Sequence, residues 1–299
     1  MQFPSVAVIV INWNGYRLTE QCLQSLVMVR YPNFKIVVVD NASTGDDTKK
    51  IKENFPEVKL IESKVNEGFT GGNNRGIEEA LSENFDYIML LNNDTEQVMN
   101  FLDKLVEFMQ KTPEAVAVQP RIHYVHDKDK VWSLGGKYNV WLGLTSSLKK
   151  AKRNEPFEID WLTGCCMLVR ACVVKEVGQL DHNFFAYYED VDWSFRMKRA
   201  GGRLYCVPEA VVYHVAGASG KTTEKVKEGF VSPFIHYLNI RNQIYFLRKH
   251  VDVMYLPSVA IYQLLLLSAY ILYFSARGRF AKLKAVIRGV RDGLKMPVK

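Results

Sequence analysis

Apolar runs alternate with helix-like stretches through the first half of the chain. Helical spacing of apolar positions is found near 16–28, 46–54, 71–83 and 99–110. Short runs with the length and composition of buried strands lie at Val6–Ile11, Phe34–Val39, Val58–Ile61, Tyr87–Leu91 and Ala115–Val118. This alternation predicts an α/β, Rossmann-like fold with a mostly parallel central sheet and right-handed crossovers.

The second half of the chain is less regular. Residues 121–160, with Gly135-Gly136 and a charged stretch at 149–155, are expected to form an excursion from the sheet or a loop on the acceptor side. Beyond them, the pattern predicts strands at Cys166–Val169 and Leu204–Val207, and helices at about 189–200 and Pro233–His250.

Polar segments follow the first four predicted strands. They are Asn12–Gly15, Asp40–Ser43, Asn66–Asn74 and Asn92–Thr95. The carboxyl ends of parallel strands meet at one edge of a sheet, where ligands of such sheets bind. One polar loop would be an ordinary turn, but four at the same edge predict a polar ligand site.

The positive charge is concentrated at the end of the chain. The net charge is +7, and residues 253–299 hold eight Lys or Arg against one acid, Asp292, so the preceding residues are neutral overall. Val253–Ser275 is free of charge, and as a helix its 23 residues would reach about 35 Å, enough to cross a bilayer core. This apolar neighbour argues against nucleic acid as the partner of the basic tail.

A basic amphipathic helix is predicted after the apolar segment. Its apolar stripe consists of Phe280, Leu283, Ile287, Val290 and Leu294, with basic residues around it. An apolar helix beside a basic amphipathic one is typical of membrane-surface binding. The alternative is a helix pair that packs on the domain or on another subunit of a homo-oligomer.

Three absences narrow the class of protein. The five cysteines include no CxxC pair, which argues against a zinc ribbon, and their odd number suits a reducing compartment. No GxGxxG fingerprint follows either of the first two strands, which argues against nicotinamide or flavin. The first residues have no basic n-region and are expected to form a strand, not a signal peptide.

Several acids and one histidine are candidates for chemistry. Asp40 can accept hydrogen bonds from a ribose or a base, and Asp94 with Asn92 or Asn93 offers oxygen ligands to a divalent cation, although turns explain both segments too. Glu189, Asp190 and Asp192 open a helix after an aromatic run, and three acids exceed what capping needs. Asp192 can pair with Arg196, which leaves Glu189 and Asp190 as candidates for a general base. His214 follows an apolar strand and is a candidate metal ligand.

These segments, taken together and in order, resemble family 2 glycosyltransferases of the rhamnosyltransferase-like branch. The resemblance covers about residues 6–220 and rests on Val37–Ser43, Gly68–Gly76, Leu90–Asp94, Trp161–Gly164 and Phe184–Arg196. It implies a GT-A fold and an inverting single displacement. Asp190 matches the catalytic base, and Asp94 matches the last acid of the DXD motif, whose first acid is replaced by Asn92 here. His214 matches a histidine that closes on the metal and diphosphate.

The expected site follows from the loops and the resemblance. We expect Asp190 and Glu189 to be catalytic, Asp94 and His214 to hold Mg²⁺ or Mn²⁺, and Trp161, Gly164 and Asp192 to lie on the acceptor side. The residues expected to bind the donor are Asn12, Trp13, Asn14, Asp40, Asn41, Ser43, Asn66, Gly71, Asn73, Asn74, Asn92 and Asn93.

The predicted function is the transfer of a sugar from a nucleotide sugar, dTDP-rhamnose or a UDP-sugar, to a saccharide acceptor. The tail suggests an acceptor linked to polyprenyl diphosphate, in cell-surface polysaccharide synthesis. The alternative is a non-catalytic sugar-nucleotide-binding or scaffold protein, favoured only by Asn92 in place of an acid. The expected domains are 1–220 for catalysis, 221–252 as a helical connector and 253–299 for membrane association.

The charge of the tail bears on its topology. Nucleotide sugars are cytoplasmic, and a single crossing would place the seven basic residues from Arg277 to Lys295 outside, against the positive-inside tendency. We therefore expect a re-entrant or in-plane helix, with the protein peripheral on the cytoplasmic face of the cell membrane.

Overall fold

A computed structural model describes residues 3–150, 154–216 and 231–298 of the chain. It divides the chain into two compact units. The first contains Met1–Lys137, Ser147–Phe185 and Glu189–Ala216, and the second contains Tyr138–Ser146, Ala186–Tyr188 and Gly217–Lys299. The expected boundary between residues 220 and 221 lies outside the described residues.

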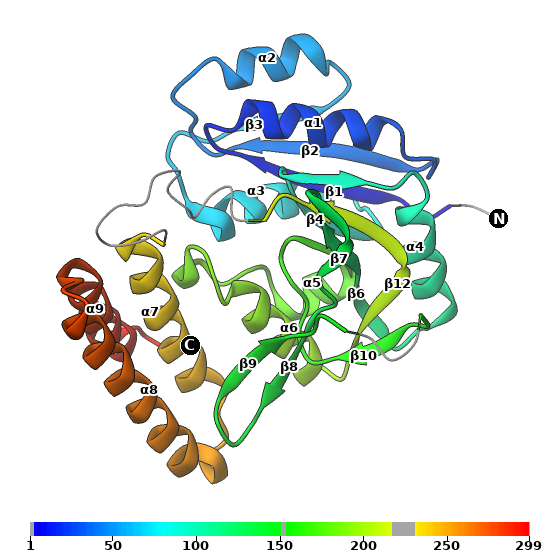
Figure 1. Cartoon of the computed structure of the whole chain (residues 1–299). Helices are drawn as coiled ribbons and strands as arrows, with labels where there is room; N and C mark the ends of the chain where they lie inside the picture. Colours follow the sequence, from blue (N-terminus) through cyan, green and yellow to red (C-terminus); the bar gives the residue numbers. More distant parts are fainter. Residues whose placement is uncertain (1–2, 151–153, 217–230, 299) are drawn as a thin grey trace. The chain divides into compact units, whose positions relative to one another are not determined.

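Four parallel strands form one half of the sheet in the first unit. They are β1 (Val6–Asn12), β2 (Phe34–Asp40), β3 (Lys59–Glu62) and β4 (Tyr87–Asn92), in the spatial order β3-β2-β1-β4 (Figure 1). Asn12 is in register with Asp40, and Ile11 with Asn92, so the polar residues that end these strands share one edge. The predicted α/β fold with a mostly parallel central sheet is confirmed.

The other half of the sheet mixes strand directions. Next to β4 lies the antiparallel β11 (Cys166–Arg170), followed by β6 (Ala115–Tyr124), β12 (Arg203–His214) and β10 (Phe157–Ile159). β5 (Thr95–Gln97) pairs with β12, and β7 (Asp127–Ser133) pairs with β6. β8 (Gly136–Asn139) and β9 (Leu144–Ser147) form a separate pair. Residues 121–160 therefore contain several strands that the sequence pattern does not indicate, and β8 with β9 departs from the main sheet.

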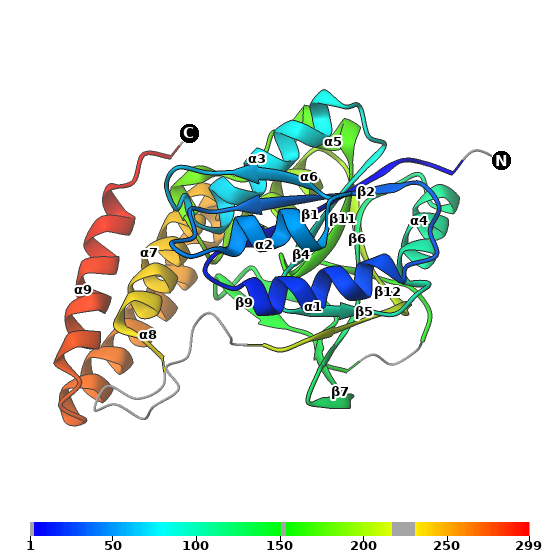
Figure 2. The same ribbon diagram turned by 90° about the horizontal axis from the view of Figure 1, so that it is seen from above.

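Helices cover both faces of the sheet because the strand side chains alternate. Val6, Val8 and Val10 face one core, which contains residues of α1 (Tyr16–Val27), α2 (Asp47–Asn54) and α4 (Phe101–Lys111). Ala7 and Ile9 face the other core, with residues of α3 (Gly68–Ser82), α5 (Ala171–Val177) and α6 (Glu189–Arg199). Figure 2 shows α3, α5 and α6 on one side of the sheet and α1 on the other.

Three helices dominate the second unit: α7 (Pro233–His250), α8 (Leu256–Ala276) and α9 (Phe280–Lys295). The Ser232 side chain caps α7, and Pro233 occupies its first turn, as the predicted helix requires. α9 approaches α7 closely at Gly289 and Gly293, where an added Cβ would lie 2.9 Å from the Tyr237 carbonyl oxygen and 2.6 Å from that of Arg241. Glycine is therefore needed at both positions for this packing.

Candidate functional site

Asn12, at the end of β1, joins two carboxylates below the edge of the sheet. Its Nδ2 lies 2.8 Å from Asp40 Oδ2 and 2.9 Å from Asp47 Oδ2, and its Oδ1 accepts from the Thr19 hydroxyl at 2.7 Å. Asn12 is fully buried and Asp40 nearly so. The parallel register of β1 and β2 brings these groups together, so the two predicted donor residues form one fixed polar cluster.

Asp47 is a member of this cluster that sequence reasoning missed. It begins α2, and its Oδ2 accepts hydrogen bonds from the backbone N–H groups of Gly15 and Tyr16, at 3.0 and 3.1 Å. An acid at the start of a helix ordinarily caps that helix, whereas Asp47 accepts hydrogen bonds from the N-terminal end of another helix, α1. The signal in the sequence is the acid pair Asp46-Asp47, of which only the second is buried.

The loops after β1 and β2 hold each other. Ser43 Oγ accepts from the Asn14 N–H at 2.8 Å and donates to Asp40 Oδ2 at 2.6 Å, while Asn14 Oδ1 accepts from the Thr44 N–H at 2.8 Å. Asn14 has a φ of 49°, a conformation that asparagine tolerates better than most residues. The Trp13 side chain stays 54% exposed on this ordered loop.

A second amide cluster orders the loop before α3. Asn41 Nδ2 donates to Asn66 Oδ1 and to the Gly68 carbonyl, each at 3.0 Å, and Asn41 Oδ1 accepts from the Glu67 N–H at 3.0 Å. The loop is therefore shaped by side chains of two predicted donor residues. Gly71 belongs to the first turn of α3 and is buried.

Asn73 and Asn74 lie inside α3, because this helix begins at Gly68 and not near residue 71. Asn74 holds both backbone groups of Leu180, donating to its carbonyl at 2.8 Å and accepting from its N–H at 3.0 Å. Asn73 donates to the Phe69 carbonyl at 2.9 Å. Both amides thus stabilise the fold here, and direct contact with a donor stays a prediction.

Asp94 and His214 meet where β4 and β12 end. His214 Nε2 lies 3.1 Å from Asp94 Oδ1, and both side chains are nearly buried. Among the residues that the structure describes, neither Asp94 Oδ1 nor His214 Nδ1 has a hydrogen-bond partner. The Nε2–Oδ1 pair is close, but it does not have the angles of a hydrogen bond.

This arrangement fits a shared divalent cation. Two ligands at about 2.1 Å and right angles around an octahedral ion lie about 3 Å apart. No group of three or more His, Cys, Asp or Glu side chains suited to a metal is found in the described residues. Asp94 and His214 would supply two ligands, a low number that is usual for Mg²⁺ sites in which substrate phosphates also bind the ion.

The two asparagines before Asp94, Asn92 and Asn93, make hydrogen bonds to neighbouring elements. Asn93 Nδ2 donates to the Thr19 hydroxyl at 2.9 Å, and the Asn92 carbonyl accepts from Thr95 Oγ1 at 2.6 Å. These contacts tie the loop after β4 to α1 and to β5.

Asp190 occupies the first turn of α6. Its Oδ2 accepts from the Gly164 N–H at 2.9 Å, and its Oδ1 accepts from the Val191 N–H at 2.8 Å. Burial raises the pKa of Asp190 despite these bonds, which suits a group that must accept a proton. Burial and, to a lesser extent, the charge of Asp190 raise the pKa of the adjacent Glu189 well above its ordinary value.

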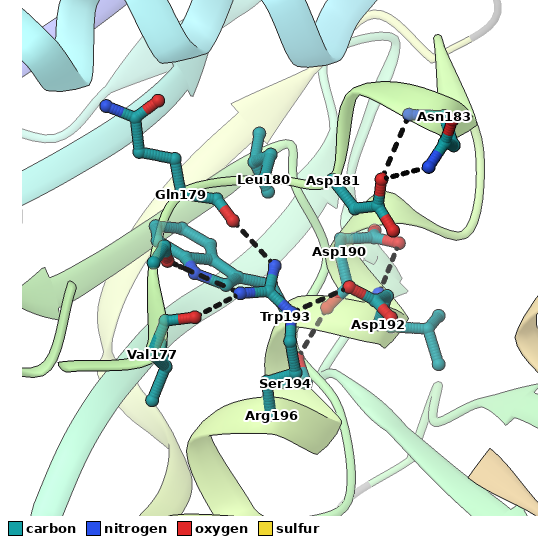
Figure 3. A network of polar contacts seen from close by, with 12 residues as sticks. Val177, Gln179, Leu180, Asp181, Asn183, Asp190, Asp192, Trp193, Ser194 and Arg196 are labelled. Carbon is teal, nitrogen blue, oxygen red and sulfur yellow. Dashed lines mark hydrogen bonds and ion pairs between the residues drawn. The ribbon is translucent and has the colours of Figure 1, made fainter. Parts of the chain in front are cut away.

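Asp192, expected on the acceptor side, lies in the interior of the first unit, and a contact with the acceptor stays a prediction. Its side chain is fully buried and pairs with Arg196 at 2.8 Å, as their spacing predicts. Figure 3 shows the Arg196 guanidinium, which also donates to the carbonyls of Val177 and Gln179 at 2.6 and 2.7 Å. A clamp of this kind fixes α6 against the preceding loop, because buried charges must be paired.

The Leu162–Cys165 segment connects Asp190 with the edge that carries Asp94. The Gly164 N–H holds Asp190, and the carbonyl of the next residue, Cys165, accepts from the Asn92 N–H at 2.9 Å. Burial raises the pKa of the Cys165 thiol, and the charges of both Asp94 and Asp190 add to this effect. The two carboxylates therefore flank one short segment.

Trp161 lies just before this segment. Its indole N–H donates to the Lys137 carbonyl at 3.3 Å, and its backbone pairs with Gly136. The ring is partly exposed, so the predicted acceptor-side position is open to contact.

Two curated relatives share about a quarter of their residues with the chain. An N-acetylglucosaminyl-diphospho-decaprenol L-rhamnosyltransferase of Mycobacterium tuberculosis is 26% identical over 72% of this chain and 77% of its own length. A dTDP-rhamnosyl transferase, RfbF, of Shigella flexneri is 25% identical over 73% of this chain and 72% of its own.

Solved structures agree on the fold. GalNAc-T7, solved with UDP, GalNAc and Mn²⁺, superposes with a TM-score of 0.65 at 17% identity, over 84% of this chain and 49% of that one. The mannosyltransferase PcManGT of Pyrobaculum calidifontis, solved with GDP-Man and Mn²⁺, gives 0.60 at 15% identity, over 99% and 88%. The GT-A fold expected from the resemblance is confirmed.

The family model described as "Glycosyltransferase like family 2" matches residues 4–229. This range contains every candidate residue described above, from Asn12 to His214. The chain belongs to glycosyltransferase family 2.

Proposed function

We propose that the chain is an inverting, divalent-cation-dependent hexosyltransferase that uses a nucleoside diphosphate sugar, dTDP-rhamnose or a UDP-sugar. The acceptor is a hydroxyl of a saccharide linked to polyprenyl diphosphate, in the synthesis of a cell-surface polysaccharide. One observation carries the proposal. Asp190, a carboxylate with a raised pKa, accepts a hydrogen bond from the Gly164 N–H, and the adjacent Cys165 carbonyl accepts one from Asn92, which precedes Asp94 in the same loop.

Donor binding is assigned to the loops after β1, β2 and β4. The cluster of Asn12, Asp40 and Asp47 fixes the loop that presents Trp13, whose exposed ring offers a surface for a base. Buried carboxylates whose positions are fixed before binding can accept hydrogen bonds from nucleoside N–H or hydroxyl groups without reorganisation.

The cation is assigned to Asp94 and His214. When bound, Mg²⁺ or Mn²⁺ would neutralise the negative charge that builds up on the leaving diphosphate. Asp94, just after β4, and His214, at the end of β12, would hold the cation, so both strand ends must keep their places. The relatives solved with Mn²⁺ support a divalent cation without choosing between the two metals.

Asp190 is assigned the role of general base. It takes the proton of the acceptor hydroxyl, the acceptor oxygen bonds to the anomeric carbon, and the bond from that carbon to the diphosphate breaks, with its electron pair leaving on the diphosphate. One displacement inverts the anomeric configuration and needs no covalent nucleophile. The Gly164 N–H keeps the carboxylate oriented during this step.

A lipid-linked acceptor agrees with the helices of the second unit. The relative from Mycobacterium tuberculosis is named for a saccharide on diphospho-decaprenol. Val253–Ala276 is the one helical stretch of the described residues that is long and apolar enough to cross a membrane, with a mean hydropathy of 1.7. Along α8, Ile261, Leu264, Leu265 and Leu272 are 61–70% exposed.

α9 adds a basic amphipathic surface. Phe280, Ile287 and Leu294, seven residues apart, are 54–59% exposed, while Val286, Gly289 and Gly293 are buried on its other side. We assign both helices to an in-plane or re-entrant contact with the cytoplasmic leaflet, where exposed apolar side chains and basic residues suit anionic lipid. A self-association of the same surface is the alternative.

Flotation on vesicles separates these cases. The wild type is expected to float with vesicles of phosphatidylglycerol and phosphatidylcholine, and less so at high salt. Leu265→Glu with Leu272→Glu should abolish flotation, while Val65→Glu, at a 60% exposed apolar position of the first unit, should not. A protein that does not float, or a double variant that floats like the wild type, would contradict the membrane assignment.

The reaction itself is tested with a panel of donors. UDP-, dTDP- and GDP-sugars are incubated with the protein and Mn²⁺ or Mg²⁺, and nucleoside diphosphate release is measured with and without EDTA. EDTA-sensitive release from one donor is expected. Binding of a donor without any release or transfer, with a lipid-linked saccharide present, would favour the non-catalytic alternative.

A further inference from the structure

We propose that Asn242, in the middle of α7, is a positioning residue for Asp190, acting through the backbone of Ala186 and Tyr187. Asn242 is fully buried, and its Nδ2 donates to both carbonyls at 2.7 Å. The inference rests on the proposed function in one respect: it takes Asp190 as the group that acts on the acceptor.

The orientation of the Asn242 amide is fixed by its neighbours. Arg241 Nε donates to Asn242 Oδ1 at 2.8 Å, so the oxygen of the amide faces a donor. The nitrogen then faces two carbonyl oxygens, which can only accept. Both hydrogens of the amide are thus directed at the same short segment.

That segment has an unusual backbone. Phe185, Tyr187 and Tyr188 have φ values of 64°, 70° and 71°, and none of them is glycine. Bulky residues rarely adopt positive φ, and such conformations persist only where surrounding contacts impose them. Tyr188 is followed directly by Glu189 and Asp190, so the segment sets the start of α6.

Several contacts hold the segment in this conformation. The Phe185 carbonyl accepts from the Thr70 N–H at 3.1 Å, and Gly68 must be glycine, since an added Cβ would clash with this carbonyl and with the Phe185 ring. The next two carbonyls are those that Asn242 holds. Tyr188 then packs on Phe246, one turn further along α7, with ring centroids 5.7 Å apart.

Loss of the Asn242 amide removes a hydrogen bond from each of the Ala186 and Tyr187 carbonyls, while the bond from Thr70 to the Phe185 carbonyl remains. We expect the segment to relax from its positive φ values, and the start of α6 to shift with it. A displacement of a catalytic group by about 1 Å can reduce the rate about a hundredfold without removing any contact to the donor.

Two variants and a matched control test this. Asn242→Asp keeps the shape of the side chain and removes both N–H donors. Should this variant fail to fold, Asn242→Ala removes the same donors without introducing a buried charge. Asn239→Ala is the control, because Asn239 is an asparagine of the same helix whose amide donates to the Ile235 carbonyl of its own helix.

The first readout is hydrogen–deuterium exchange of peptides that contain residues 184–190. Exchange in the Asn242 variants should rise about tenfold or more there and stay unchanged in β4, while Asn239→Ala should resemble the wild type. The second readout is steady-state transfer. The kcat of the Asn242 variants should fall about 10- to 100-fold, with the KM for the donor within about threefold of the wild type.

The outcomes separate the two proposals. Unchanged exchange at 184–190, or a donor KM that changes as much as kcat, would overturn the role of Asn242. If the wild type transfers no sugar from any donor while exchange rises as expected, the proposed function fails, and Asn242 is still shown to hold the segment before Asp190.

Discussion

His214 Nε2 lies 3.1 Å from Asp94 Oδ1, yet the two atoms do not form a hydrogen bond. Under the proposed function these two atoms are ligands of one divalent cation, and their separation fits two adjacent ligands about 2.1 Å from it. Both side chains are nearly buried.

Removal of either ligand should therefore weaken the binding of the cation. We expect His214→Ala and Asp94→Asn to raise the Mn²⁺ concentration for half-maximal turnover by about 10- to 100-fold, a range typical for changes around a metal ligand. His123→Ala is the control, since His123 is a histidine of the neighbouring strand β6 that is directed at Tyr213. Isothermal titration with Mn²⁺ and UDP gives the affinity, and an unchanged affinity in both variants would refute the assignment.

Asp47 gives a prediction about donor affinity. Asp47→Asn replaces the charged acceptor of three N–H groups, two of them at the start of α1, by a neutral amide oxygen, and this should cost about 1–3 kcal/mol of unfolding free energy. The loop that carries Trp13 should loosen, and the dissociation constant of the nucleotide should rise about tenfold. Asp46→Asn is the matched control, because Asp46 is an exposed neighbour whose carboxylate pairs with Lys50 at 2.9 Å. Equal effects of both substitutions on nucleotide binding would contradict the role of Asp47.

The Asp192–Arg196 pair should affect folding and not acceptor choice. Breaking a buried ion pair on one side leaves an uncompensated charge, so Asp192→Ala should lower the unfolding free energy by about 3–5 kcal/mol. Arg196→Lys should not restore the wild type, since lysine cannot reach the carboxylate and the carbonyls together. Urea unfolding measures both. If Asp192→Ala retains the wild-type stability but shows a higher KM for the acceptor, the acceptor-side expectation was right after all.

The raised pKa of Glu189 should make the stability of the folded protein depend on pH. Its folded pKa is raised above the unfolded value of about 4.3, so its favourable contribution is complete below that value and is lost as the pH rises through the folded pKa. Glu189→Gln removes the buried charge and should raise the melting temperature at pH 8, by about 2–4 °C for each kcal/mol gained. The advantage should vanish near pH 4. Calorimetry from pH 4 to pH 8 checks this, and a difference that does not vary with pH would count against a buried, perturbed carboxyl.

β1, β2 and β4 were predictable because their side chains are buried on both faces. Runs such as Val37–Val39 are continuous and apolar, and that pattern is typical of parallel strands between helices. β7 to β10 carry no comparable pattern. Most of β7 is exposed and charged, and its strand character comes from pairing with β6, which no local pattern records.

The site divides in the same way. Asp94, Asp190 and His214 could be proposed from the sequence because they follow or open regular elements in a recognisable order, and their roles stay predictions. Asp47 was missed because its partners, Asn12, Gly15 and Tyr16, lie more than 30 residues earlier in the chain, and Asn242 because the carbonyls it holds are 55 and 56 residues earlier. The pairing of Asp192 with Arg196 was predicted, but the burial of the Asp192 side chain was not.

The central claim concerns Asp190, and one comparison tests it most directly. Asp190→Asn keeps the size of the side chain and an oxygen that can accept the Gly164 N–H, but it cannot take a proton at neutral pH. With the donor selected by the panel, Mn²⁺ and a lipid-linked saccharide, transfer by this variant should fall by a factor of about 10² to 10⁴, while its affinity for the nucleotide stays within about threefold of the wild type. Full transfer by Asp190→Asn in the same assay would contradict the account.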